Sequence, residues 1–262
     1  MTLEEAKQMA EQGDIGAMCS LGDFYIKQNT GDGIEEAAKW YEMAAEKNVI
    51  YAIHMTVLSK KILAYAGLQI VDGSEMGWDF VKKDWEEVYD WASREMKMLN
   101  DEVSGSEQID RGQAIGNYND AVYHLALCNY QLKNHQVVVS LLKDNNEKRA
   151  KVLYGSALFD MANYDNEYEY ALQQFKFIDG DVEYASAKKS RYEEKVYTVS
   201  ALVLSQLYRQ GLGEKGATPN LEKAVKLLNF VKSYLTNDGM IELVDEELQH
   251  YQKKLFGGYK YV

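Results

Sequence analysis

The sequence predicts an all-α protein built from about five helical hairpins stacked into a solenoid, with one more helix at the C-terminal end. Only one proline, Pro219, occurs in 262 residues, and proline is rare in helix interiors because it removes a backbone donor. Apolar residues make up 46% of the chain, and they recur at helical rather than strand spacing. Residues 13–47 are also echoed at 202–231, which is typical of helical repeat proteins.

The first unit, residues 2–47, begins with a helix expected over 2–12. Thr2 and Glu5 have the spacing of a capping box, in which each residue bonds the other's backbone N–H. Gly13 then ends this helix, because glycine readily adopts the left-handed conformation found just after helix C-termini.

A second helix is expected over 14–28, with Asp14 as its N-cap. Gly22 lies on the apolar face of this helix, where glycine costs about 1 kcal/mol of helix propensity. We therefore expect a neighbouring helix to approach closely at Gly22. After a turn, Asp32 is the expected N-cap of a third helix, which carries a broad stripe of apolar residues.

The same spacing predicts four further helical hairpins, at approximately 49–100, 110–143, 147–178 and 182–235. In the first of these, the apolar stripe of the second helix consists of Val81, Trp85, Val88, Ala92, Met96 and Leu99. The polar residues 101–108 are a possible joint within a single domain, 1–262.

The last hairpin and the segment that follows it have their own signals. Asn220 is the expected N-cap of the hairpin's second helix, and Thr218 competes for this role because Pro219 would then take the first helical position. An amphipathic helix at 240–256 is expected to cap the array, since the last repeat otherwise exposes an apolar face. The tail at 257–262 is expected to be loosely held.

Two stretches of the chain carry a family pattern. The stronger one consists of Ala17, Leu21–Gly22, Tyr25, Gly31, Gly33, Ala37, Trp40–Tyr41 and Ala44–Ala45. The partial one consists of Leu204–Ser205, Tyr208, Gly211–Gly213, Lys223 and Ala224. These residues resemble the Sel-like repeat family, a relative of the tetratricopeptide repeat. The three middle hairpins lack the glycine pattern and are more similar to degenerate tetratricopeptide units. The resemblance implies a right-handed solenoid that serves as an adaptor and has no active site.

Charge and hydropathy exclude several classes of protein. Lys and Arg total 29 against 41 Asp and Glu, a net charge of −12, which disfavours binding to nucleic acid or to anionic membranes. The N-terminus is acidic rather than basic, so a signal peptide is not expected. The most apolar segment, 49–71, contains His54, Lys60 and Lys61, which disfavours a membrane span. We expect a cytoplasmic protein.

Motifs for catalysis or metal binding are weak. His124 and Cys128 are four residues apart on one expected helix, with His135 further along. Zinc sites use three or four ligands, and no CxxC or HExxH pattern completes this pair, so we expect ordinary packing residues and no metal or cofactor. Cys19 and Cys128 are expected to be buried, reduced thiols. Because the chain has neither a Gly-x-Ser-x-Gly elbow nor a P-loop, we do not expect an enzyme.

Tyrosine is unusually frequent, with 20 residues in the chain, and most are expected to fill helix interfaces. Some would lie on the concave face that tetratricopeptide geometry implies, together with amide and cationic side chains suited to an extended peptide. This register predicts a binding face of Lys27, Tyr123, Tyr130, Gln131, Gln206 and Arg209. The expected function is therefore an adaptor or scaffold that binds a protein or peptide. The alternatives are a regulator that senses a peptide or small ligand and, less favoured, an enzyme on a helical scaffold.

Overall fold

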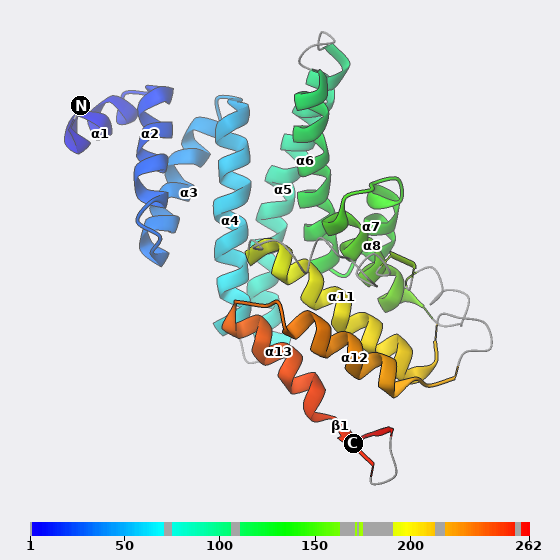
Figure 1. The fold of residues 1–262 in the computed structure, drawn as a ribbon. Helices are drawn as coiled ribbons and strands as arrows, with labels where there is room; N and C mark the ends of the chain where they lie inside the picture. The colour runs from blue at the N-terminus through cyan, green and yellow to red at the C-terminus, as the bar shows by residue number, and fades with distance from the viewer. Residues whose placement is uncertain are drawn as a thin grey trace. The chain divides into compact units, whose positions relative to one another are not determined.

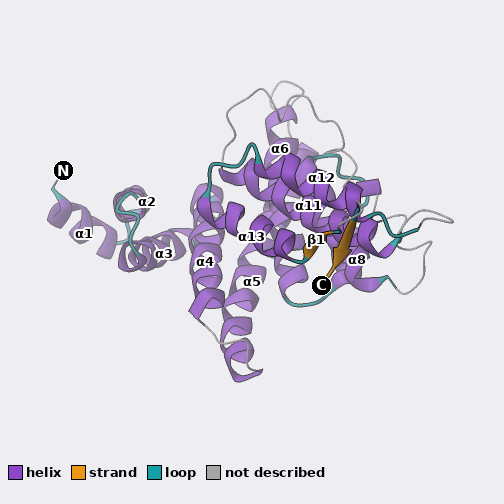
Figure 2. Ribbon diagram, turned by 60° about the horizontal axis from the view of Figure 1, so that its bottom comes forward, coloured by secondary structure: helices purple, strands orange, loops and turns teal. Residues whose placement is uncertain are grey.

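A computed structural model describes residues 2–70, 75–105, 111–162, 171, 173–174, 191–212, 218–254 and 258–262. Within this part of the chain nearly all regular structure is helical, and a single antiparallel pair of short strands completes it (Figures 1 and 2). The all-α prediction is confirmed. The chain divides into two compact units, Met1–Asn134 and His135–Val262.

The first unit is a succession of helices that pack in the order of the sequence. Each helix makes its main contacts with the helices directly before and after it in the chain (Figure 1). The helices are α1 (Leu3–Glu11), α2 (Ile15–Ile26), α3 (Gly31–Ala45), α4 (Ile50–Ile70), α5 (Glu75–Gly105) and α6 (Arg111–Gln131). Residues 101–105 of the possible joint therefore belong to α5, and 106–108 lie outside the described residues.

The N-terminal caps follow the sequence prediction with one exception. At α1, Glu5 N donates to Thr2 Oγ1 at 3.2 Å and Thr2 N donates to a Glu5 carboxylate oxygen at 2.8 Å, so the capping box is confirmed. Asp14 caps α2 by accepting from Ala17 N at 2.7 Å. The prediction of Asp32 as a cap is wrong, because Thr30 accepts from Gly33 N at 3.1 Å and α3 already begins at Gly31.

The contact between α2 and α3 depends on Gly22. A Cβ atom at this position would lie 2.5 Å from the ring of Tyr41, which is fully buried. The expected close approach of a neighbouring helix is therefore confirmed. The Tyr41 hydroxyl donates to Asp23 Oδ1 at 2.7 Å, and Tyr51 on α4 donates to the same oxygen at 2.6 Å. One carboxylate on α2 thus holds the two following helices.

We expect Gly22→Ala to lower the free energy of unfolding by about 1–3 kcal/mol, the range for an overpacked core. The added methyl group would displace the Tyr41 ring, at a cost larger than the gain in helix propensity. Chemical denaturation measures the change. Gly31→Ala is the matched control, because its Cβ would meet no atom within 4 Å. Equal stability of the two variants would show that the contact between α2 and α3 does not require glycine at position 22.

The second unit contains five described helices and the strand pair. The elements are α7 (His135–Leu142), α8 (Lys148–Met161), α11 (Arg191–Gln210), α12 (Leu221–Lys232), α13 (Asp238–Gln249), β1 (Tyr251–Lys253) and β2 (Tyr259–Tyr261). Helix α11 packs on α8, α12 and α13. Most of the second half of the hairpin predicted at 147–178 lies outside the described residues.

The C-terminal segment differs from the prediction. Asn220 caps α12 as expected, accepting from Lys223 N at 2.9 Å. Helix α13 ends at Gln249, however, so the helix predicted over 240–256 is too long. The chain continues as β1, which pairs with β2 in the register Tyr251↔Tyr261. The described end of the tail, 258–262, is thus held by backbone hydrogen bonds, and the prediction of a loosely held tail is wrong for these residues.

Candidate functional site

A carboxylate occupies a core position on α5. The buried stripe of this helix consists of Val81, Trp85, Val88, Ala92, Glu95 and Leu99. The sequence prediction placed Met96 in this stripe, and that assignment is wrong: Glu95 is 1% exposed, whereas Met96 is only partly buried. Spacings of four and three residues alternate along the stripe, and the alternation passes through Glu95. A buried acid requires partners.

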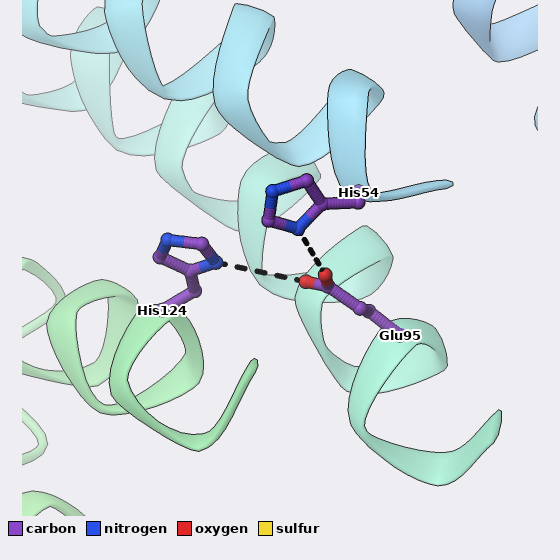
Figure 3. A group of neighbouring side chains, drawn as sticks. All are labelled: His54, Glu95 and His124. Carbon is purple, nitrogen blue, oxygen red and sulfur yellow. Dashed lines mark hydrogen bonds and ion pairs between the residues drawn. The ribbon is translucent and has the colours of Figure 1, made fainter. Parts of the chain in front are cut away.

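Two histidines from neighbouring helices approach Glu95. His54 on α4 donates from Nδ1 to Glu95 Oε1 at 2.6 Å. His124 on α6 brings its Nδ1 to 3.6 Å from Oε2, within ion-pair distance but too long for a hydrogen bond. The centroids of the two rings are 5.8 Å apart, and each ring faces one oxygen of the carboxylate (Figure 3). Three helices thus supply one side chain each to what we call the His–Glu–His cluster: His54, Glu95 and His124.

Burial and charge act in opposite directions in the cluster. Burial raises the pKa of Glu95, but the electrostatic interactions with His124 and His54 outweigh this effect, so that the pKa of Glu95 lies below its usual value. For His124, burial dominates and lowers the pKa, while Glu95 opposes this effect. At neutral pH the cluster therefore contains a carboxylate beside a largely neutral His124.

Two atoms of the cluster lack hydrogen-bond partners. Glu95 Oε2 and His124 Nδ1 are both inaccessible to solvent, and neither forms a hydrogen bond within the described structure. The side chain of His124 is 6% exposed, whereas that of His54 is 36% exposed. An unsatisfied carboxylate oxygen facing an unsatisfied imidazole nitrogen is an unusual arrangement in a protein core, and it calls for an explanation.

A pocket of about 260 Å³ opens beside the cluster. Its lining residues come from α4, α5 and α6 and are Ile50, Tyr51, His54, Glu95, Leu99, Asn117 and Asp120. Two carboxylates, an amide, a phenol and an imidazole line this pocket beside two aliphatic side chains, Ile50 and Leu99. The chemistry of this pocket suits a cation or a hydrogen-bonding ligand.

The six predicted binding residues are spread over both units. Lys27 is exposed at the C-cap of α2. On α6, Tyr123, Tyr130 and Gln131 are half-buried. Burial is the main cause that raises the pKa of Tyr65 on α4; the charge of Tyr123 raises it further, and a hydrogen bond with Gln131 lowers it.

Gln206 and Arg209 are half-buried on α11, in the second unit. The guanidinium of Arg209 stacks on the ring of Tyr261, 3.8 Å from its centroid. Three of the six predicted residues thus lie on α6. That the six residues form one binding face stays a prediction.

Sequence reasoning missed His54 and Glu95. The sequence pattern grouped His124 with Cys128 and His135, and these were expected to be ordinary packing residues. The available signal was Glu95, an acid in the register of an apolar stripe, and His54, an imidazole in an otherwise apolar segment. Neither signal identifies the partner, because the three residues meet only through the packing of α4, α5 and α6.

The thiols provide a separate test of the packing around α6. Cys128 is buried, and this burial raises its pKa to about 12. In a Cys19→Ser background, we expect Cys128 to react with a thiol reagent at pH 8 at least about a hundredfold more slowly in the folded protein than in denaturant. The kinetics of thiol modification measure both rates. Equal rates would show that the thiol is exposed.

Comparisons with known proteins do not extend these observations: no family model matches the chain, and no curated protein matches it. The resemblance to Sel-like repeats therefore rests on the residues of the pattern. Among the described helices, none combines the length and the apolar character needed to cross a bilayer.

Proposed function

We propose that the chain is a cytoplasmic adaptor of the Sel-like repeat type, a solenoid that binds a protein or peptide partner. The main support is the first unit, where successive helices pack on their neighbours in sequence, because such rows present long surfaces built from several helices. The two free cysteines fit a reducing compartment.

A groove across α3, α4 and α5 is the surface that best supports this proposal. Its cavity measures about 610 Å³, and its lining residues are Glu42, Glu46, Lys60, Glu87, Asp90, Trp91 and Arg94. We call it the acidic groove, because four carboxylates face two cations. Lys60 Nζ lies 3.2 Å from Glu42 and 3.0 Å from Glu87, so it bridges the two walls.

The second cation of the acidic groove is also engaged. Arg94 donates to Asn48 Oδ1 at 2.7 Å and lies 3.6 Å from Glu46, and its guanidinium is 4.9 Å from the Trp91 ring. Because both cations of the groove are engaged within it and the carboxylates outnumber them, the groove keeps an excess of negative charge. Complementary charge favours a partner segment that carries Lys or Arg.

Affinity capture with two charge-matched variants tests the proposal. Glu46→Lys with Asp90→Lys reverses two exposed carboxylates in the acidic groove, and Glu242→Lys with Glu246→Lys makes the same charge change on α13. We expect the wild type and the α13 variant to retain a partner from cell extract, as quantified by mass spectrometry, and the groove variant to lose at least about tenfold of it. Equal capture by all three proteins would contradict the proposed groove.

The predicted face on α6 and α11 is tested separately. Tyr130→Ala combined with Arg209→Ala removes one aromatic and one cationic side chain from the two helices. If the partner contacts this face, capture is abolished. Unchanged capture would remove these residues from the binding site and leave the acidic groove as the candidate.

A second candidate function is a regulator that senses a small ligand or peptide, and the pocket beside Glu95 favours it. A ligand that binds only the folded protein raises its melting temperature. A screen of small organic ligands by thermal denaturation, with a chelator present, separates the two functions, since an adaptor without its protein or peptide partner gives no shift.

A further inference from the structure

We propose that His54, Glu95 and His124 bind one divalent transition-metal ion, with zinc as the best-suited metal. This inference does not depend on the adaptor function, because the pocket beside the His–Glu–His cluster and the acidic groove share no lining residue.

The positions of the donor atoms carry the inference. One ligand atom from each of the three side chains lies within 4.8 Å of the others. A tetrahedral zinc site with bonds of about 2.0–2.1 Å separates its ligand atoms by about 3.3–3.4 Å. His54 Nδ1 lies 2.6 Å from Oε1 and His124 Nδ1 lies 3.6 Å from Oε2, so the two nitrogens approach different oxygens of the carboxylate, at distances on either side of this value.

The chemistry of the donors fits the same metal. Two imidazoles and one carboxylate are a ligand set found in zinc sites that keep a fourth position open. His54 and Glu95 also line the pocket, together with the polar side chains of Asn117 and Asp120. Binding through His54 Nδ1 requires the neutral tautomer that carries its proton on Nε2, so metal binding replaces the hydrogen bond from Nδ1 to Glu95.

A purely structural ion-pair network explains the cluster less well. In such a network each buried polar atom would have a partner, because an unsatisfied atom costs the full desolvation penalty. Glu95 Oε2 and His124 Nδ1 instead remain unsatisfied and face one another. A cation between them satisfies both atoms at once.

Titration calorimetry with zinc on full-length chain, free of a polyhistidine tag and stripped with a chelator, tests the proposal. We expect one zinc ion per chain. His54→Ala is the informative variant, because His54 is the most exposed of the three ligands and its loss disturbs the core least. Its dissociation constant should rise at least about a hundredfold, the upper range for disturbed metal sites. His250→Ala, an exposed histidine on the second unit, should bind like the wild type.

A measurement on the wild type removes any dependence on variant folding. X-ray absorption at the zinc edge should show imidazole nitrogen and oxygen ligands and no sulfur. Absence of binding to the wild type, equal binding by His54→Ala, or a zinc–sulfur contact would each overturn the proposal.

Discussion

His124→Ala is expected to lose about 2–5 kcal/mol of the free energy of unfolding at pH 7 in the presence of a chelator, the range for large-to-small substitutions in a core. The side chain is buried on α6, so its removal leaves a cavity. It also takes away one of the two imidazoles beside the Glu95 carboxylate, which is itself 1% exposed. Denaturant titration measures the loss. Glu242→Ala, which changes an exposed residue of the second unit, serves as the control and should stay within about 0.5 kcal/mol of the wild type, as surface substitutions do.

The electrostatic part of this effect is separable by a double-mutant cycle. In a Glu95→Gln background the carboxylate is already absent, so His124→Ala should cost about 1–3 kcal/mol less than in the wild type. Strictly additive costs would mean that Glu95 and His124 do not interact, and would remove the electrostatic basis of the His–Glu–His cluster.

The second large effect is expected at Glu194 in the other unit. Its side chain is buried on α11 and accepts three hydrogen bonds from the segment that leads into α13. Thr236 N donates at 3.0 Å, Thr236 Oγ1 at 2.5 Å and Asn237 N at 2.9 Å. Asn237 is the N-cap of α13, so one carboxylate fixes the start of that helix.

We expect Glu194→Ala to cost about 2–4 kcal/mol, because hydrogen bonds to a charged group are strong and buried donors without partners add a penalty. Equilibrium denaturation gives the value. The control is Glu242→Ala, which removes an exposed carboxylate from α13 itself. A similar loss in both variants would indicate a general charge effect instead of the specific anchor.

Local features of the fold were predictable from sequence, because they depend on residues a few positions apart. The capping box of Thr2 and Glu5 and the caps at Asp14 and Asn220 all follow this rule. Asp32 failed because Thr30, two residues earlier, offers an equally suitable oxygen and the helix begins sooner. Local rules identify a cap region but do not choose between adjacent candidates.

Contacts between residues far apart in the chain could not be predicted from the sequence. His54 and Glu95 are 41 residues apart, and only the packing of α4 on α5 brings them together. Helical spacing paired His124 with Cys128, whereas the structure pairs it with an acid on another helix.

The C-terminal strands show the same limit. Pairing of Tyr251 with Tyr261 is a non-local contact, and Tyr261 then stacks on Arg209 of α11. A tail judged by composition alone gave no sign of this anchor.

The central claim is that the first unit binds a partner through the acidic groove, and site-specific photo-cross-linking tests it most directly. A photo-reactive amino acid replaces Asp90 in one protein and Glu242 in another, both exposed positions. The account predicts a cross-link to the captured partner from position 90 and none from position 242. A cross-link from position 242 alone would contradict it.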